Sequence, residues 1–319
     1  MNRLPFLLPP AFLLAACSSA PGTAAPSERP AETASARLAR QALAPARLVA
    51  ACKDHDGWGD PAPPAQLYGN TYYVGTCGIS AILITGAAGH VLIDGGIPEA
   101  APLVLANIKA AGFDPKDVRW ILSSHEHFDH AGALAALSRA TGAKVAALPA
   151  AAQVLESGKA DPADPQYGGL DAFPAVHVDK RLTDGEKLTL GNITLTARAT
   201  LAHAAGSTSW TWQSCDDQGK CLTIAYADSA SAISAKGYRF TDHPERIAAV
   251  RQGYTRIAEL PCDLLVTPHP GASDLFARLA DTAPLVDPTA CRAYAAAATT
   301  RFDQRLSQEA GSQAKETRS

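Results

Sequence analysis

The sequence ILSSHEHFDHAG, residues 121–132, places three histidines and two acidic residues within six positions, directly after an apolar run. The chain has nine histidines in all, so a third of them lie in this segment. Side chains two positions apart in an extended segment share a face, so His125 and His127 should point the same way. Asp129 and His130 follow as the chain turns, and they can face a second point nearby. Because zinc binds both imidazole nitrogen and carboxylate oxygen, the segment predicts a metal centre.

The remaining ligands of this centre should come from other parts of the chain. Zinc takes about four ligands per ion. The four candidates in HEHFDH, its three histidines and Asp129, are too many for one ion in this geometry and too few for two. His203, after the run ITLTARATLA, and His269, which ends DLLVTPH, both follow predicted strands. Glu126 alternates away from the neighbouring histidines, and we expect it to face solvent. The other histidines are expected at the surface or at helix caps: His55, His90, His177 and His243.

The hydrophobic pattern predicts a layered α/β domain. Short apolar runs predict strands at 66–74, 80–86, 90–96, 118–124, 143–148, 187–199, 207–214, 221–227 and 263–269. Helical patterns occur at 98–112, 132–142, 244–260, 273–281 and 288–310, and residues 157–178 read as a long loop. Strands lead into helices in both halves of the chain, which predicts two sheets inside and helices outside.

The N-terminus, MNRLPFLLPPAFLLAAC, has the features of an export signal. Arg3 supplies the positive charge, and the apolar stretch that follows is too short to span a bilayer. A buried helix is the alternative, but the prolines at positions 9 and 10 argue against it. The end of the stretch, LAAC, resembles the lipobox of bacterial lipoproteins, so we expect Cys17 to be lipidated. We therefore divide the chain into a signal at 1–17, an Ala/Pro/Ser-rich tether at 18–47, a catalytic domain at 48–312 and a polar tail at 313–319.

Composition limits the classes of partner. Of the 319 residues, 18% are charged and 47% hydrophobic, which is enough to build a sizeable core. The net charge is -3 and there is no basic run, so neither nucleic-acid binding nor attraction to an anionic membrane is indicated. The partner must therefore be inferred from the metal site.

Six cysteines remain after Cys17, and an even number in an exported protein indicates disulfides. Six cysteines allow 15 connectivities, and the pattern alone does not choose among them. Cys215 and Cys221 are the clearest pair, because CDDQGKC reads as a polar turn between two strands. No pair has the C-x-x-C spacing of a zinc-thiolate site, which favours disulfides over metal binding.

The segment HEHFDH matches the His-x-His-x-Asp-His signature of the metallo-β-lactamase superfamily. LIDGG, residues 92–96, resembles the preceding strand end of that family, where Asp94 usually supports the metal loop. Within the superfamily the chain resembles the subclass B3 enzymes from about residue 50 to 310. Part of this likeness is YADSAS, residues 226–231, in which Ser229 stands where other subclasses have a cysteine ligand.

The resemblance implies an αβ/βα four-layer sandwich and a dizinc β-lactamase. It assigns one zinc to His125, His127 and His203, and the other to Asp129, His130 and His269. It gives Asp129 the role of orienting the zinc-bound hydroxide, and Ser229 and Ser231 that of binding the substrate carboxylate. The disulfides that it implies are Cys52–Cys77, Cys215–Cys221 and Cys262–Cys291. The expected partner is a small β-lactam substrate. We expect the protein to be a monomer in the periplasm of a Gram-negative-type bacterium.

One segment departs from the family. The third histidine usually lies in Gly-His-Thr-Pro-Gly, whereas this chain has AHAAG at 202–206. Loss of a glycine, a hydroxyl and a rigid turn leads us to expect a weaker orientation of His203. Two alternatives therefore stay open: a hydrolase of this fold acting on a lactone or thioester, and an exported zinc-binding lipoprotein with little turnover. The feature that favours the β-lactamase is DSAS, residues 228–231.

Overall fold

The computed structural model describes residues 1, 38 and 41–316. The expected lipidation site Cys17 and most of the signal and tether lie outside the described residues. No helix within the described part of the chain is long and apolar enough to cross a membrane.

The described strands form two sheets. The first has seven strands in the order β1-β2-β3-β4-β5-β6-β7, and the second has five in the order β12-β11-β10-β9-β8. The strands of the first sheet are β1 (Ala65–Tyr68), β2 (Thr71–Tyr73), β3 (Ile82–Ile84), β4 (His90–Ile93), β5 (Val118–Leu122), β6 (Lys144–Ala147) and β7 (Lys180–Arg181). Those of the second are β8 (Lys187–Leu190), β9 (Ile193–Ala199), β10 (Thr208–Cys215), β11 (Cys221–Tyr226) and β12 (Leu264–Val266).

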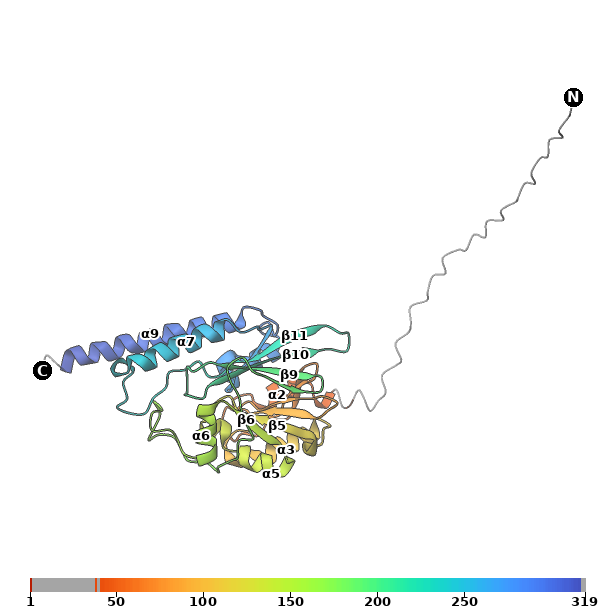
Figure 1. Cartoon of the computed structure of the whole chain (residues 1–319), viewed down its shortest axis with the longest axis horizontal. Coiled ribbons are helices and arrows are strands. Elements are labelled where there is room, and N and C mark those ends of the chain that lie inside the picture. The colour runs from red at the N-terminus through yellow and green to blue at the C-terminus, as the bar shows by residue number, and fades with distance from the viewer. Residues whose placement is uncertain (2–37, 39–40, 317–319) are drawn as a thin grey trace.

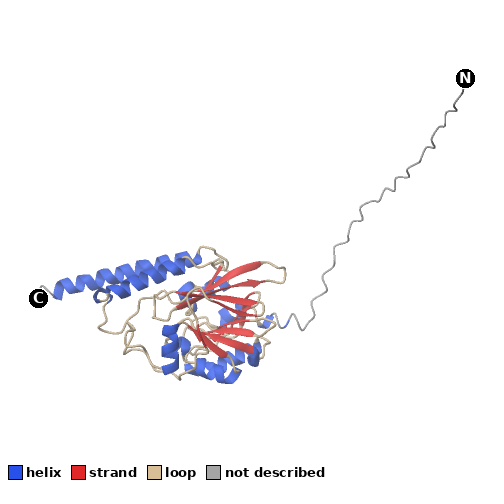
Figure 2. Cartoon of the chain, viewed as in Figure 1, coloured by secondary structure: helices blue, strands red, loops and turns tan. Residues whose placement is uncertain are grey.

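Helices cover the outer face of each sheet, and the strands lie between them (Figure 1, Figure 2). The α-helices are α2 (Pro45–Ala51), α3 (Ala101–Ala110), α4 (Phe128–Ala131), α5 (Leu134–Thr141), α6 (Pro149–Ser157), α7 (Pro244–Ala258), α8 (Leu275–Leu279) and α9 (Ala290–Glu316). Short 3-10 turns are η1 (Pro98–Ala100), η2 (Pro115–Asp117), η3 (Phe240–Asp242) and η4 (Pro270–Ser273).

Three hydrophobic cores hold these four layers together. The core between the sheets includes Ile82 and Ile84 of β3 together with Trp210 of β10. A second core packs α3, α5 and α6 against the first sheet, and a third packs α7 and α9 against β11 and β12. Three interfaces of this kind define the expected αβ/βα sandwich, and that prediction is confirmed.

The strand patterns explain how one sheet is buried on both faces. In β3, Ile82 and Ile84 face the other sheet, whereas Leu83 between them joins the core beneath the helices. Alternate side chains of a strand point to opposite faces, so a sheet between two layers needs apolar residues at every position. The continuous run ILI therefore encodes a central strand.

Two expected strands are in fact hairpins. The run predicted at 66–74 divides into β1 and β2 around Gly69, and the run predicted at 187–199 divides into β8 and β9 around Gly191. Both glycines have positive φ, 49° and 57°, a conformation that glycine adopts without steric cost. The prediction was wrong here because both halves of each hairpin are β-rich.

The helices differ from expectation mainly at their ends. Helix α6 was missed, although Pro149 opens it and Gly158 closes it with a φ of 67°. The helix predicted at 132–142 spans Leu134–Thr141 and is closed, as expected, by Gly142. Helix α2 begins before the expected domain boundary at residue 48, and α9 continues past residue 312.

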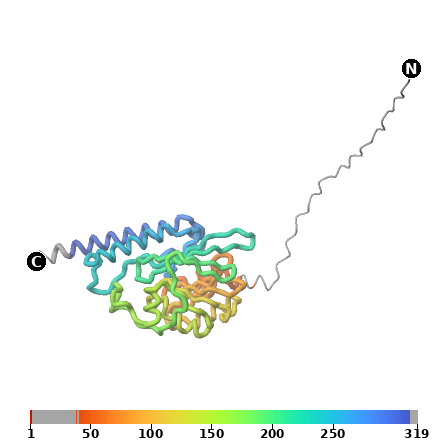
Figure 3. Tube along the Cα trace, viewed as in Figure 1, coloured from red at the N-terminus to blue at the C-terminus, as the bar shows by residue number. Residues whose placement is uncertain are grey.

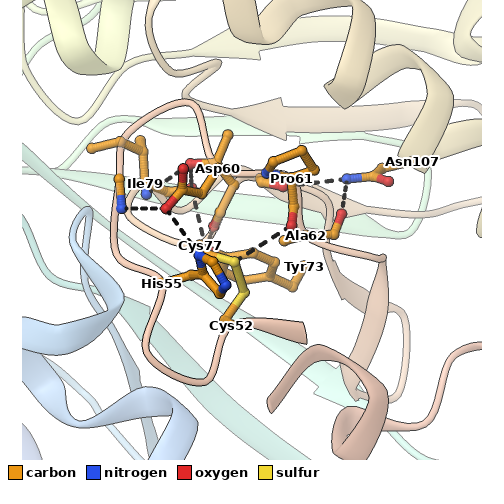
Figure 4. Close-up of a disulfide and its surroundings, with 12 residues drawn as sticks. Cys52, His55, Asp60, Pro61, Ala62, Tyr73, Cys77, Ile79 and Asn107 are labelled. Carbon is orange, nitrogen blue, oxygen red and sulfur yellow. Dashed lines mark hydrogen bonds and ion pairs between the residues drawn. A yellow bond between two sulfur atoms is a disulfide. The ribbon is translucent and has the colours of Figure 1, made fainter. Parts of the chain in front are cut away.

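The structure contains the three expected disulfides, Cys52–Cys77, Cys215–Cys221 and Cys262–Cys291. The first links the end of α2 to the segment after β2, as shown in Figure 4. Nearby, the buried Asn107 of α3 donates to the backbone oxygens of Ala62, Val74 and Gly75 at 2.9–3.2 Å. These links fasten residues 53–62 to the first sheet.

In Figure 3 the first half of the chain, coloured orange to yellow-green, lies beside the second half, coloured green to blue. Residues 65–181 supply the first sheet and residues 187–266 the second. The carboxyl ends of β5 and β12 lead into the histidine segment and into His269 respectively. Residues far apart in sequence therefore meet at one edge of the sandwich.

Candidate metal centre

The segment HEHFDH forms the expected strand-to-helix turn. Strand β5 ends at Leu122, and His127 has extended backbone (φ -79°, ψ 154°) before α4 begins at Phe128. Helix α4 then carries Asp129 and His130. The change from extended to helical backbone explains why one six-residue segment supplies two sets of side chains.

The first set consists of His125, His127 and His203. One ring nitrogen from each lies within 4.8 Å of the others, and all three residues are buried. Nε2 of His125 is buried without a hydrogen-bond partner. Burial, together with the nearby His127, lowers the pKa of His203 to about 3, so its ring is neutral and has a free lone pair. These are the properties of a metal site.

The second set consists of Asp129, His130 and His269. Nε2 of His130 lies 3.0 Å from Oδ2 of Asp129 and 3.2 Å from Nε2 of His269. Nε2 of His269 lies 3.3 Å from the same oxygen of Asp129. Burial opposes ionisation of Asp129, but the charge and hydrogen bond of His130 hold its pKa below the usual value. Three donor atoms therefore converge on one point.

The two sets adjoin each other. The rings of His125 and His130 are 4.3 Å apart, and the donor atoms of His125, Asp129 and His130 also lie within 4.8 Å of one another. Asp129 thus borders both sets.

Each histidine of the first set has a partner that fixes its orientation. Nδ1 of His125 lies 2.8 Å from Oδ1 of Asp228, and both side chains are fully buried. Nε2 of His127 lies 3.0 Å from Oδ2 of Asp164. When these nitrogens donate to the carboxylates, Nε2 of His125 and Nδ1 of His127 keep their lone pairs.

The third histidine is oriented by a backbone group. Nδ1 of His203 lies 2.8 Å from the carbonyl oxygen of Ser231 and 3.0 Å from its hydroxyl. On the other side of the site, Nε2 of Gln166 lies 3.4 Å from Nδ1 of His127 and 3.3 Å from Nε2 of His203. One amide reaches both nitrogens, which shows that their lone pairs point into the same space.

Asp94 supports the start of the histidine segment, as expected from LIDGG. It is fully buried with a φ of 60°, and it accepts hydrogen bonds from the backbone and the hydroxyl of Ser124 and from the hydroxyl of Tyr226, each at 2.7 Å. Oδ2 of Asp94 lies 3.7 Å from Nδ1 of His130. Asp94 therefore ties the start of the turn to β11 and faces a ligand candidate.

Glu126 is buried, contrary to the expectation that it faces solvent. Its side chain is 4% exposed, and Oε1 accepts a hydrogen bond of 2.8 Å from the backbone nitrogen of Gly206. A Cβ at Gly206 would lie 2.4 Å from Oε2 of Glu126 and 2.5 Å from the backbone nitrogen of Ala151, so only glycine permits this approach. Glu126 does alternate away from the histidines, but on that side it meets the His203 loop instead of water.

The histidines outside the two sets are not ligand candidates. His55 and His177 are exposed, and His243 is half-buried at the N-cap of α7, as expected. His90, in contrast, is 8% exposed, because it lies in β4 and its ring packs against Phe113 at 5.1 Å.

Two residues that the sequence reading missed lie among these partners, Asp228 and Asp164. Asp228 lies two residues after the end of the buried strand β11, and a carboxylate just beyond such a strand is a signal that could have been used. Asp164 lies in the long loop ADPADPQYGG, where nothing distinguishes it from its neighbours.

Trp58 borders the site from outside. Its ring is 5.8 Å from that of Phe128 and 6.2 Å from that of His269, and the residue is 44% exposed. Of the two serines expected to bind a carboxylate, Ser229 is 5% exposed, and the hydroxyl of Ser231 lies against His203.

The donor atoms suit zinc, because neutral imidazoles and one carboxylate are ligands that this ion prefers. The orphaned Nε2 of His125 is an additional indication, since a buried polar atom without a partner is costly unless something binds it. The paired donor sets are therefore consistent with a metal-binding hydrolase fold.

Comparisons with known proteins agree with this geometry. The profile of the Metallo-beta-lactamase superfamily matches residues 74–217. The metallo-β-lactamase MIM-1 from Novosphingobium pentaromativorans is 60% identical, with 83% of this chain and 98% of that chain covered and a TM-score of 0.82. The chain therefore belongs to the metallo-β-lactamase superfamily.

Two further comparisons refine its position. MEM-A1, a subclass B3 metallo-β-lactamase from a soil metagenome library, is 42% identical, with 80% of this chain and 100% of that chain covered and a TM-score of 0.77. The N-acyl homoserine lactonase AttM of Agrobacterium fabrum strain C58 is 35% identical over 81 residues, which span 18% of this chain and only 31% of the lactonase. Within the superfamily, the chain is thus similar to subclass B3 over nearly its whole folded length.

Proposed function

We propose that the protein is a dizinc β-lactamase that hydrolyses the amide bond of penicillins, cephalosporins and carbapenems and so confers antibiotic resistance. The observation that carries this proposal is the pair of adjoining donor sets, three histidines beside Asp-His-His. Similarity to MIM-1 and MEM-A1 over almost their full lengths supports it.

One zinc ion would be held by His125, His127 and His203, and the second by Asp129, His130 and His269. When bound, the ions would lower the pKa of a water molecule towards neutrality and polarise the carbonyl of the amide. Everything else in the reaction depends on how the chain holds its ligands and its substrate.

Asp129 is the residue to which we assign the orientation of the attacking water. Its Oδ2 lies 3.0 Å from Nε2 of His130 and 3.3 Å from Nε2 of His269, and it also neighbours His125. A carboxylate between the two sets can accept a hydrogen bond from a water that approaches the substrate carbonyl.

Three groups are suited to bind the substrate. The exposed ring of Trp58, beside Phe128, provides an apolar surface next to His269. Ser229 and Ser231, in the segment that follows β11, are proposed to donate hydrogen bonds to the carboxylate of the antibiotic. Ser231 would do so while its backbone oxygen continues to hold His203.

We further propose that the protein acts as a monomer in the periplasm, anchored by a lipid at Cys17. This proposal rests on the signal and lipobox pattern of the sequence. The division into signal, tether, catalytic domain and tail belongs to the same proposal.

Hydrolysis of a chromogenic cephalosporin with added zinc tests the function, together with a penicillin, a carbapenem, an acyl homoserine lactone and a thioester. His269→Ala should abolish turnover, whereas His177→Ala, a change at an exposed histidine, should leave it unchanged. Turnover of the lactone without any β-lactam would favour the lactonase alternative, for which the partial similarity to AttM is the supporting observation. Stoichiometric zinc without turnover of any substrate would favour a zinc-binding lipoprotein.

A further inference from the structure

The loop that carries His203 lacks the family's Gly-Thr-Pro residues, yet it is held firmly. None of residues 202–205 has positive φ, so the backbone here does not need the missing glycine. Within the loop, the hydroxyl of Ser207 accepts a hydrogen bond of 2.9 Å from the backbone nitrogen of Ala204. The backbone nitrogen of Gly206 donates to Glu126, as described above. These contacts fasten the end of the loop.

The beginning of the loop is held by one side chain. Nη1 of Arg246 donates to the carbonyl oxygen of Leu201 at 2.9 Å, and Nη2 donates to those of Ala202 at 2.9 Å and His203 at 2.8 Å. Three successive carbonyls, including that of the ligand candidate itself, thus converge on one guanidinium. The planar fork of arginine suits such an arrangement, whereas the point charge of lysine does not.

Helix α7 aims this guanidinium. Arg246 and Gly253 are seven residues apart, two helical turns, and so lie on the same face. At Gly253 the helix backbone comes so close that a Cβ would lie 2.7 Å from the backbone nitrogen of Ala202. The helix therefore contacts the loop at two points, and these contacts restrict the movement of the loop.

The position of Arg246 would be unfavourable without these contacts. It lies in the first turn of α7, where the helix dipole disfavours a positive charge. Burial lowers its pKa, and the charge of Asp164, the partner of His127, acts in the opposite direction. An arginine occupies this position despite both costs, and its hydrogen bonds to three carbonyl oxygens offset them.

We propose that Arg246 is a positioning residue for the metal ligand His203, and that it takes the place of the absent Gly-Thr-Pro pattern in fixing this loop. The inference rests on the proposed zinc site, but it does not require that the substrate be a β-lactam. The three hydrogen bonds of Arg246 go to backbone carbonyl oxygens of this loop, so its effect on the metal site passes through the orientation of His203.

The test compares Arg246→Met and Arg246→Lys with Arg251→Met. Arg251 lies on the same helix and pairs with Asp303 at 2.7 Å on the surface, so its variant controls for loss of an arginine from α7. Hydrogen exchange of the metal-free proteins, followed across residues 200–208, reports on the loop without zinc or substrate. Stepwise zinc titration against a chromophoric chelator, with His203→Ala and His269→Ala as references, assigns each binding step to one set.

We expect Arg246→Met to accelerate exchange in residues 200–208 and to weaken by about tenfold the zinc step that His203→Ala removes, at the low end of effects from residues behind a metal ligand. The step removed by His269→Ala should be unchanged, Arg246→Lys should lose less, and Arg251→Met should match the wild type. The proposal is overturned if exchange and zinc binding are unchanged in Arg246→Met, or if both zinc steps weaken equally and exchange rises throughout the protein. If Arg246→Met does not fold, Arg246→Lys provides the test. Hydrogen exchange and zinc binding in Arg246→Lys equal to those of the wild type would then overturn the proposal. Zinc bound normally without turnover of β-lactams would contradict the proposed function but not this inference.

Discussion

Replacing Asp228 by alanine should weaken zinc binding through His125. Oδ1 of Asp228 lies 2.8 Å from Nδ1 of His125, and neither side chain is exposed. Without the carboxylate, the tautomer that zinc requires, with the proton on Nδ1 and the lone pair on Nε2, loses its acceptor, whereas the metal-free ring is free to adopt either tautomer. The penalty of an unpaired buried N–H, about 1–3 kcal/mol, therefore falls on the metal-bound state.

This penalty corresponds to a loss of roughly 5- to 150-fold in zinc affinity, since about 1.4 kcal/mol is tenfold. We expect Asp228→Asn to lose less, because its amide oxygen can still accept the hydrogen bond, although without the charge. Competition with a chromophoric chelator measures both values. Asp263→Ala is the matched control, because Asp263 accepts a hydrogen bond of 2.8 Å from Thr223 at the far ends of β11 and β12. Zinc affinity within twofold of wild type in Asp228→Ala would refute the reasoning.

Three further outcomes are expected. The purified protein should hold about two zinc ions, since each donor set supplies three ligands, and chelation should abolish activity until zinc is restored; full activity with one ion would contradict this. His203→Ala should lose most activity. The triple variant Ala202→Gly, Ala204→Thr and Ala205→Pro should not raise kcat/KM, because the loop is already anchored. A tenfold gain in kcat/KM would show that the loop is poorly held. Cys17→Ala should move the protein from the membrane fraction to the soluble periplasmic fraction with unchanged activity per molecule, and a wild type already soluble would refute the anchor.

Much of the site could be predicted because its residues are concentrated in sequence. The alternation in HEHFDH separates His125 and His127 from Asp129 and His130, and the structure brings both groups together with histidines that follow strands. The local pattern worked because the period of a strand, and the break where a helix begins, determine which side chains share a direction.

The residues behind the ligands could not be predicted in the same way. Asp164 and Arg246 reach the site from a loop and a helix remote in sequence, and their roles depend on tertiary packing alone. Glu126 shows the same limit, since alternation gave its direction correctly but not that another loop would cover it. The hairpins at Gly69 and Gly191 were missed because β propensity does not report where a strand reverses.

The connectivity of the disulfides has a consequence for how the chain is made. Each bridge joins two cysteines that are adjacent in the order of the sequence, at separations of 25, 6 and 29 residues, so no bridge encloses or crosses another. If Cys17 is lipidated and the other cysteines are oxidised as they emerge from a translocation channel, the second cysteine of each pair finds its native partner as the nearest preceding thiol. Consecutive pairing then yields the native connectivity directly, and an oxidase suffices without a disulfide isomerase.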